Sequence, residues 1–330
     1  MSRMEIHPGI DALPSGLRFA MAVGAFDGVH RGHQALVSQL VARAAAIEAS
    51  PVLITFEPHP AAFLRGDLPR LLCSVAERDA RLAELGVEHL VVQRFDAPFA
   101  SLTAEAFLER LRVQRDLLAV VMTPGSAFGR GRSGTTEVVR EIGDRRGFAL
   151  IEVAALLADG VPISSTRIRD LVESGRLRDA SRLLGRRPAV SGRVVRGDAR
   201  GVALGFATAN LAFEVPVCLP PDGIYAVGVT WGGPDPLRPA RSAGGVASLG
   251  VRPTFGGGAR WLEVHLLDLD EDLYDLDLRV TFVRRQRSER RFAGAQPLIV
   301  QMARDVERAR SILGLATGGS TRVARSGDDW

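Results

Sequence analysis

The chain has 330 residues, enough for two domains of ordinary size, and its formal net charge at pH 7 is +4. All 42 positively charged residues are Arg. This excludes functions that need a Lys, such as P-loop, protein-kinase-type and Schiff-base chemistry. Any phosphate chemistry must therefore use Arg, His, backbone N–H groups and a metal ion.

Other features of the composition narrow the class of protein. No apolar run approaches the roughly 20 residues of a membrane helix, and the N-terminus lacks the apolar core of a signal peptide. Cys73 and Cys218 lie far apart and predict neither a disulfide framework nor a metal cluster. Arginines are interspersed with acidic residues and aromatic residues are sparse, which disfavours nucleic-acid binding. We expect a cytoplasmic protein that binds neither nucleic acid nor membrane, and weak self-association is left open.

The first predicted elements are a strand and a helix joined by a glycine-rich turn. Phe19–Val23 is an apolar strand candidate, and apolar residues at helical spacing predict a helix over Gln34–Ala49. The turn is broken by small or polar residues, namely Gly24, Asp27, Gly28 and Gly32. It carries His30 and His33 beside the helix start, where two imidazoles can stabilise charge developing on a phosphate. The alternative is two surface histidines in a loop.

The region up to about residue 153 continues the alternation of strands and helices. Further strands are predicted at Val52–Phe56, His89–Val92, Leu118–Met122 and Ala149–Val153. Further helices are predicted at Val75–Leu85, Ala104–Leu111 and Thr136–Arg145. This alternation predicts a parallel sheet with helices on both faces, which binds ligands beyond the C-terminal ends of its strands. Thr55–Pro60 and Pro124–Gly134 fall there, as does the histidine turn.

A second helix start carries hydroxyl and guanidinium groups. Ser164, Ser165 and Thr166 are good N-cap residues, and apolar residues at helical spacing follow them. Arg167 and Arg169 lie in the first turn. An ordinary capping sequence is the alternative, but two anion-ready helix starts in one α/β domain fit the two ends of one triphosphate.

The pattern changes around Leu183–Pro188. Beyond this linker, strands separated by turn residues predict a small all-β barrel, closed by a helix over Pro297–Leu313. The predicted strands are Val190–Val195, Gly223–Thr230, Gly245–Leu249, Trp261–Leu267 and Leu278–Val283. We therefore predict one domain over residues 1–186, a second over 187–316, and a disordered tail over 317–330.

The barrel has its own candidate site. A loop with Gly197, Gly201 and Gly205 can wrap phosphates through backbone N–H groups. Thr208 and Asn210 follow it and offer neutral oxygens that suit Mg²⁺. Glu263 lies on a predicted strand, where the alternative to a catalytic role is a glutamate that simply faces solvent.

These motifs together resemble the bifunctional riboflavin kinase/FAD synthetase family of bacteria, from about Val23 to Arg310. The segments that resemble the adenylyltransferase half are Gly24–His33, Thr55–Pro60 and Ser164–Arg169. The segments that resemble the kinase half are Thr208–Asn210, Asp222–Ala226, Gly250–Phe255, Leu262–His265 and Gln301–Asp305. The resemblance implies a Rossmann-like nucleotidyltransferase-type α/β domain followed by a flavokinase barrel with a C-terminal helix, in agreement with the pattern.

The resemblance also implies two transferase activities. The barrel would phosphorylate riboflavin with ATP and Mg²⁺, with Thr208 and Asn210 as metal ligands, Glu263 as base, and Gly197, Gly201, Gly205 and Thr208 around ATP. The first domain would transfer AMP from a second ATP to FMN and release FAD. His30 and His33 would act at the α-phosphate. Its other implied ATP-binding residues are Gly24, Phe26, Asp27, Gly28, Gly32, Ser164, Ser165, Thr166 and Arg169, and its implied flavin-binding residues are Pro58, Pro60 and Phe128.

The chain departs from the family pattern at three places. Ala207 replaces the Pro that usually precedes Thr-Ala-Asn, and Ser248 replaces an Asn. Gly125 and Ser126 stand where the family has Asp or Asn followed by Phe in the loop beside the flavin. The alternative is therefore a riboflavin kinase whose adenylyltransferase domain is weakened or has changed its substrate. A flavin-binding protein without turnover is a further alternative.

Overall fold

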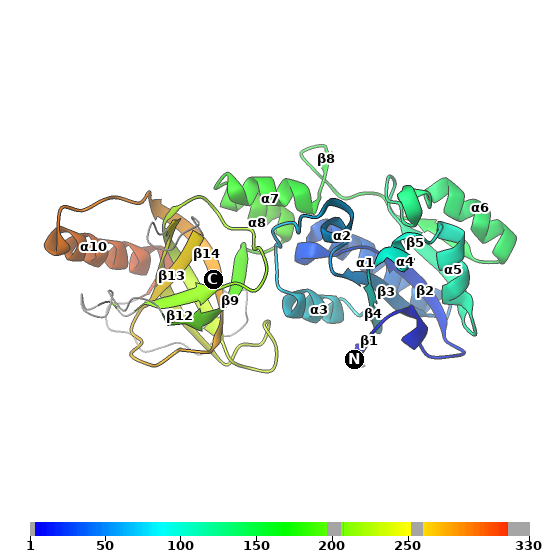
Figure 1. Ribbon diagram of the computed structural model, residues 1–330, viewed down its shortest axis with the longest axis horizontal. Coiled ribbons are helices and arrows are strands. Elements are labelled where there is room, and N and C mark those ends of the chain that lie inside the picture. The colour runs from blue at the N-terminus through cyan, green and yellow to red at the C-terminus, as the bar shows by residue number, and fades with distance from the viewer. Residues whose placement is uncertain (1–3, 197–205, 207, 252–259, 316–330) are drawn as a thin grey trace. The chain divides into compact units, whose positions relative to one another are not determined.

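The computed structural model describes residues 4–196, 206, 208–251 and 260–315 (Figure 1). The chain forms two compact units. The first unit contains residues 1–69 and 78–164, and the second contains residues 70–77 and 165–330. The predicted boundary near residue 186 and the predicted disordered tail stay predictions, and the tail lies outside the described residues.

The first unit is built on a six-stranded sheet with the order β1-β4-β3-β2-β5-β6, in which every pairing is parallel. Its strands are β1 (Glu5–His7), β2 (Arg18–Val23), β3 (Ser50–Glu57), β4 (His89–Arg94), β5 (Asp116–Met122) and β6 (Ala149–Glu152). The predicted parallel sheet is therefore confirmed.

Helices cover both faces of this sheet. The helices are α1 (Arg31–Ala46), α2 (Pro60–Arg65), α3 (Val75–Glu84), α4 (Ala97–Ala100), α5 (Ala104–Arg112) and α6 (Thr136–Arg146). In β2, Phe19 and Met21 pack in a core with residues of α5 and α6, whereas Ala20 and Ala22 pack with residues of α1 and α3. Because successive side chains of a strand point to opposite faces, one apolar strand contributes side chains to two hydrophobic cores.

The order of the strands places a switch point at β2. The chain runs from β2 through β3 to β4 on one side, then returns to form β5 and β6 on the other side. In such sheets the ligand crevice lies beyond the C-terminal ends of the two strands where the order reverses. Those strands are β2, which leads into the histidine turn, and β5, which leads into the loop that contains Gly125.

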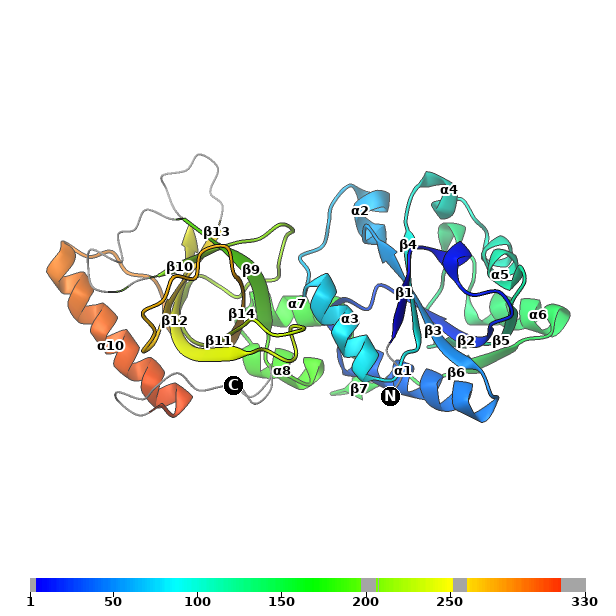
Figure 2. The ribbon, with the colours of Figure 1, turned by 90° about the horizontal axis from the view of Figure 1, so that it is seen from below.

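The second unit is a closed antiparallel barrel with the order β10-β13-β12-β11-β14-β9 (Figure 2). Its strands are β9 (Ala189–Val195), β10 (Ala209–Ala212), β11 (Gly223–Trp231), β12 (Arg241–Val251), β13 (Arg260–Leu266) and β14 (Asp277–Arg287). The helix α10 (Ala295–Leu313) packs along the barrel through Ala309, against Ala226 and Leu267. The predicted barrel and closing helix are confirmed.

Several short elements escaped prediction from the sequence. They are β1, β10, the hairpin of β7 (Leu157–Ala158) and β8 (Val161–Pro162), and the helix α8 (Leu177–Leu184). The strands are too short to show a clear apolar period, whereas α8 buries Leu177, Ala180, Leu183 and Leu184 at helical spacing and could have been predicted. Helix α1 also begins at Arg31 rather than Gln34, because the side chain of His30 serves as its N-cap. The helix α7 (Ser165–Glu173) begins at the predicted capping sequence.

Residues 70–77 contact the rest of the second unit through a β-bridge and a buried ion cluster. Leu71 forms a parallel bridge with Val217. The carboxylate of Glu77 accepts hydrogen bonds from Arg279 at 3.1 and 3.2 Å and from Arg186 at 3.2 Å. All three side chains are at most 6% exposed. We call Glu77, Arg186 and Arg279 the buried ion cluster.

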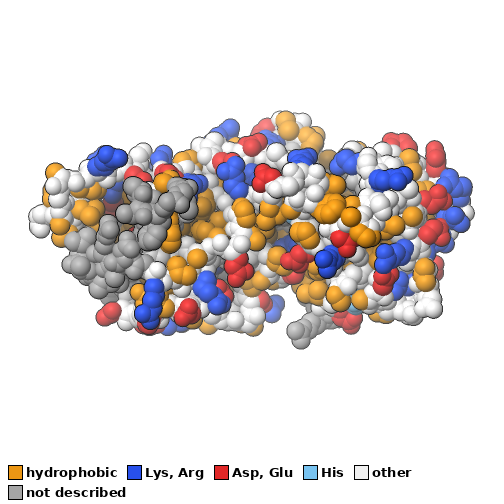
Figure 3. Space-filling view, in the orientation of Figure 1, with side chains coloured by type: hydrophobic (Ala, Val, Ile, Leu, Met, Phe, Trp, Pro, Cys, Tyr) orange, Lys and Arg blue, Asp and Glu red, His pale blue; other side chains and the backbone are white. Residues whose placement is uncertain are grey.

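The surface carries mixed charge. On the face that Figure 3 shows, arginines lie interspersed with acidic side chains. Among the described residues, none of the helices has the length and apolar character to cross a membrane.

Candidate active sites

The histidine turn forms a compact constellation at the C-terminal end of β2. The rings of His30 and His33 stack with centroids 3.6 Å apart and an interplanar angle of 17°. The backbone N–H of His33 donates a 3.2 Å hydrogen bond to Nδ1 of His30. Phe26, which is buried, packs edge-on against His33 with centroids 5.2 Å apart. The rings are therefore held in one geometry and are not two loosely placed surface histidines.

The backbone of this turn is strained, as functional turns often are. Phe26 has φ of 52° and Val29 has φ of 38°, which is costly for a β-branched residue. Gly32 is required by close packing, because a Cβ there would lie 3.2 Å from the His30 ring and 3.3 Å from the carbonyl oxygen of Ile163. The approach of Gly32 to Ile163 places the residue just before Ser164 next to the histidine turn.

The electrostatics of the turn bear on how its two histidines can contact a phosphate. Burial and the neighbouring His30 hold the pKa of His33 well below its usual value. Two stacked imidazolium rings would repel each other, and His30 uses Nδ1 as an acceptor. The stacked pair thus cannot supply two cations at neutral pH. A neutral imidazole can still donate one N–H to a phosphate oxygen, and Nδ1 of His33 is shielded from solvent with no hydrogen-bond partner in the described part of the chain.

The loop after β3 connects to the same edge. The Thr55 hydroxyl donates a 3.3 Å hydrogen bond to the carbonyl oxygen of Ala25. The side chain of His59 caps α2 through the N–H of Ala61, while Pro58 and Pro60 flank His59. These residues shape the loop, and the flavin-binding role of Pro58 and Pro60 stays a prediction.

Prediction from the sequence missed a chain of aromatic rings at this edge of the sheet. Neighbouring ring centroids lie 5.4–5.8 Å apart. The rings belong to Phe56, Phe63, Phe95, Phe99, Phe107 and Phe128. Phe128 packs on Phe107 at 5.4 Å and also borders the core. Such rings can contact a planar flavin, although Phe128 itself is partly committed to the core.

The atypical loop after β5 has an open position for a larger side chain. Gly125 has φ of 78°, and a Cβ there would meet no atom within 4 Å. Ser126 turns back on the chain, because its hydroxyl donates a 2.6 Å hydrogen bond to the carbonyl oxygen of Thr123. The missing amide and aromatic groups are thus not replaced at these two positions.

Ser165, Thr166 and Arg169 lie at the start of α7, in the second unit, while Ser164 is the last residue of the first unit. The Nε atom of Arg169 donates a 2.8 Å hydrogen bond to the carbonyl oxygen of Arg70. To bind a phosphate through Nε, Arg169 must first break its hydrogen bond to the carbonyl oxygen of Arg70. The phosphate-binding role of these residues stays a prediction.

The barrel brings the predicted kinase residues onto neighbouring strands. Glu263 on β13 lies directly opposite Asn210 on β10 and directly opposite Ser248 on β12. Directly opposed residues in an antiparallel pair have Cβ atoms about 4.5–5.5 Å apart. Leu262 and Val264 fill the barrel core, so Glu263 faces away from it. The carboxylate and the Asn210 amide, which is 5% exposed, can therefore act on one ligand.

Thr208 precedes β10, two residues before Asn210. The ring of Phe206 packs edge-on against His265 with centroids 5.3 Å apart, so His265 supports the approach to this strand by packing. The predicted phosphate-binding residues Gly197, Gly201 and Gly205, and the segment Arg252–Phe255, lie outside the described residues.

The segment Asp222–Ala226, which resembles the kinase half, contributes to the architecture of the barrel through two of its residues. Tyr225 is fully buried, its hydroxyl donates to the carbonyl oxygen of Pro221, and burial raises its pKa to about 12. Arg260 clamps Asp222 with two hydrogen bonds of 2.6 and 2.8 Å.

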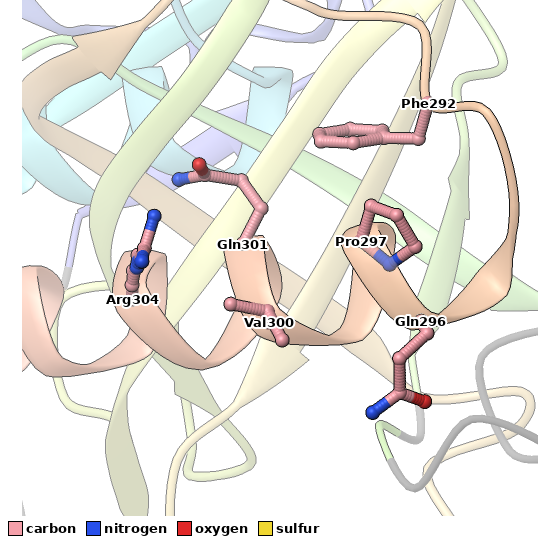
Figure 4. A pocket seen from close by; sticks show the side chains of 6 residues that line it. All are labelled: Phe292, Gln296, Pro297, Val300, Gln301 and Arg304. Carbon is pink, nitrogen blue, oxygen red and sulfur yellow. The ribbon is translucent and has the colours of Figure 1, made fainter.

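A pocket of about 540 Å³ lies between α10 and the segment before it. It is lined by Phe292, Gln296, Pro297, Val300, Gln301 and Arg304. In Figure 4 the Phe292 ring lies over Pro297, and the remaining side chains follow along α10. The pocket is an open, mostly apolar depression, since Gln296, Pro297, Val300 and Arg304 in its lining are exposed. The sequence pattern pointed to Gln301–Asp305 but not to Phe292 or Val300.

An ion pair anchors this pocket to the barrel. Arg287 on β14 donates three hydrogen bonds of 2.6–3.0 Å to Asp305 on α10. Gln301 donates another to Asp305 at 2.9 Å, and the guanidinium of Arg287 lies 6.0 Å from the centre of the Phe292 ring. The pocket wall is therefore pre-organised before any ligand binds.

The chain matches two family models, FAD synthetase over residues 15–167 and riboflavin kinase over residues 184–313. Over 298 residues it is 39% identical to the bifunctional riboflavin kinase/FMN adenylyltransferase of Escherichia coli (strain K12), covering 89% of this chain and 93% of the relative. It is 35% identical over 317 residues to that of Pseudomonas fluorescens, covering 94% and 98%.

Among solved structures, the chain resembles one from Streptococcus pneumoniae that is described as a macrolide-efflux protein. The TM-score is 0.82 at 29% identity, covering 94% of this chain and 99% of that chain. That likeness supports the arrangement of secondary structure along the whole chain. The two family models follow one another along the chain, and both relatives match it over nearly their whole length. The chain therefore belongs to the family of bifunctional riboflavin kinase/FMN adenylyltransferases.

Proposed function

We propose that this chain phosphorylates riboflavin to FMN with one ATP and then transfers AMP from a second ATP to FMN, which yields FAD. The observation that carries the proposal is the presence of two separate constellations, one in each unit. One is the stacked histidine pair at the switch point of a parallel sheet. The other is Glu263 opposite Asn210 in the barrel.

In the kinase step Glu263 takes the proton from the terminal hydroxyl of riboflavin, whose oxygen attacks the γ-phosphorus of ATP, and ADP leaves. Asn210 and Thr208 offer oxygen donors beside this carboxylate, a set that fits Mg²⁺ and not a softer metal. Mg²⁺ held there would neutralise charge on the transferred phosphoryl group. The pocket between α10 and Phe292 is the proposed place for the isoalloxazine ring.

In the adenylyl transfer step an oxygen of the FMN phosphate attacks the α-phosphorus of ATP, and pyrophosphate leaves. The substrate is itself the nucleophile, so the protein contributes positioning and stabilisation of charge. His33 and His30 do this as hydrogen-bond donors in a fixed stack, because His33 stays neutral in the free protein. Ser164, Ser165, Thr166 and Arg169 hold the outgoing phosphates in this proposal. Because both steps consume ATP, we keep the cytoplasmic location as a prediction.

One incubation tests the proposal. The full chain is mixed with riboflavin, ATP and Mg²⁺, and riboflavin, FMN and FAD are separated over time. We expect FMN to appear first and FAD to follow. Accumulation of FMN without FAD would support a kinase with an altered adenylyltransferase half, and the absence of both products would support a flavin-binding protein without turnover.

The alternative rests on the loop at Gly125 and Ser126, and a double variant tests it. Gly125→Asn with Ser126→Phe restores the amide and the aromatic ring of the family pattern. Asn tolerates the positive φ at position 125, where a Cβ has open space. A neutral hydrogen bond and an aromatic contact together contribute about 1–3 kcal/mol. We therefore expect the KM for FMN in FAD synthesis to fall by about 5- to 150-fold.

The KM for ATP and the kinase rate should stay nearly unchanged in this variant. Ser126→Ala is the matched control, because it removes only the hydrogen bond to Thr123. If the folded double variant keeps the KM for FMN of the parent chain, another segment already holds the flavin, and this loop does not limit the second activity.

A further inference from the structure

A cluster of metal-binding side chains lies at the edge of the sheet in the first unit, on residues that neither activity uses. Glu5 and His7 share one face of β1, and His89 opens β4. The parallel register of the two strands sets Glu5 opposite His89. One ligand atom from each side chain lies within 4.8 Å of the others.

The distances in this cluster are close to those of a metal site. Nε2 of His7 and Nδ1 of His89 lie 2.9 Å apart and share a hydrogen bond, whose proton zinc would displace. The Glu5 carboxylate oxygen lies 3.8 Å from the first nitrogen and 3.7 Å from the second. Tetrahedral zinc with bonds of about 2.0–2.1 Å needs neighbouring ligand atoms about 3.3–3.4 Å apart. The three observed distances bracket that value, so small rotations of the side chains suffice.

The surroundings prepare His7 as a ligand. His7 is 8% exposed. The ring of His7 also forms a hydrogen bond with the backbone of Ala12. Metal-binding histidines commonly use their second nitrogen in this way, which fixes the orientation of the ring.

One nearby cation opposes metal binding, and its effect is limited. The positive charge of Arg115 lies near enough to the His7 ring to interact with it. Its guanidinium donates to the carbonyl oxygens of Leu13 and Asp11 at 2.8–3.0 Å, so it is directed at the backbone and not at the cluster. Glu5 contributes the compensating negative charge from the solvent side, because its side chain is 64% exposed.

We propose that Glu5, His7 and His89 form a zinc-binding site, with water as the fourth ligand. Two imidazole nitrogens and one carboxylate oxygen are a zinc donor set, whereas Mg²⁺ and Ca²⁺ prefer oxygen alone. The ion fastens the three-residue edge strand β1 to β4. Zinc therefore acts as a structural clasp on the first unit and takes no part in either transfer reaction.

Zinc binding by the full chain tests this proposal after the protein has been freed of metal with a chelator. Zn²⁺ is titrated in competition with a chromophoric chelator, and Co²⁺ is used in parallel as a visible-absorbing probe of tetrahedral coordination. Binding should persist in His33→Gln, which removes a histidine of the stacked pair, and should be lost in His89→Gln. At a hundredfold excess over Kd, zinc should raise the Tm of the first unit by about 5–10 °C, and it should not do so in His89→Gln.

A second pair of variants covers the possibility that His89→Gln misfolds. Glu5→Gln changes an exposed ligand and should weaken zinc binding by about tenfold or more, whereas Glu88→Gln next to His89 should leave it unchanged. Zinc binding that is absent from the parent chain, that survives both His89→Gln and Glu5→Gln, or that disappears in His33→Gln would overturn the proposal. The last result would place the ion at the histidine turn.

Discussion

Glu263→Gln is expected to lower the rate of riboflavin phosphorylation by about 10²–10⁴-fold while conversion of supplied FMN to FAD continues. The reason is that the amide keeps the shape of the side chain opposite Asn210 but cannot accept the hydroxyl proton. The rates of FMN formation from riboflavin and of FAD formation from FMN are measured on the same preparation. A misfolded variant would lose both, and a specific effect removes only the first.

Two variants serve as controls for this experiment. Glu271→Gln removes a half-exposed carboxylate that pairs with Arg241, and both rates should stay near those of the parent chain. His33→Ala should show the opposite pattern, with normal FMN formation and FAD synthesis reduced by about 10²–10³-fold. The cap of α1 survives in that variant, because the backbone N–H of residue 33 is the donor. Near-normal kinase turnover in Glu263→Gln would mean that the carboxylate is only a residue on the face of a strand.

Glu77→Gln is expected to destabilise the second unit by about 3–5 kcal/mol, because it leaves the guanidinium groups of Arg186 and Arg279 buried without their carboxylate. Urea unfolding followed by tryptophan emission measures this cleanly. Of the three tryptophans, Trp231 lies on β11 and Trp261 on β13 of the barrel, while Trp330 lies outside the described residues. In a Trp330→Phe background the emission therefore reports on the second unit.

The matched control is again Glu271→Gln, whose exposed ion pair should contribute at most about 1 kcal/mol. Replacing the whole buried ion cluster with Met or Leu should recover most of the lost stability, since it removes the unpaired charges as well. A midpoint in Glu77→Gln equal to that of the control would show that the cluster is hydrated and contributes little.

The same cluster bears on a fragment that starts near Pro188, which we expect to phosphorylate riboflavin by itself. This fragment keeps Arg279 but lacks Glu77 and Arg186, so it should be active but less stable than the barrel in the full chain. Arg279→Met should restore stability to the fragment and lower it in the full chain. A folded fragment that makes no FMN would show that the barrel depends on residues before Pro188.

Long apolar strands and amphipathic helices could be predicted from the sequence, because their period repeats over enough residues to be recognised. The strands β2 to β5 and the helix α10 are of this kind, and the four-residue strand β6 could be predicted from its place in the alternation of strands and helices. The short strand β10 could not be recognised, since it follows a glycine-rich loop and has only four residues. Missing β10 also hid the pairing of Asn210 with Glu263, which depends on the register of strands that lie far apart in sequence.

The sequence was enough to predict which residues form the candidate sites, but not their protonation states or their packing. The histidine turn could be found from its glycines and its place between a strand and a helix. The neutral state of His33 could not, because it depends on a stacked ring and on burial. The aromatic chain around Phe99 likewise emerges only when elements distant in sequence meet, and Phe292 lines a pocket only through the path of the segment just before α10.

The assignment of residues 70–77 to the second unit has a consequence for how such a gene can be divided. A single break between the two predicted domains would leave Glu77 on the N-terminal protein, although it packs in the second unit. Recombination or gene fission at that point must then be accompanied by new partners for Arg279, or by an apolar residue in its place. For the engineer who wants the barrel alone, the eight-residue segment Arg70–Glu77 can be supplied separately as a peptide or fused at a new terminus.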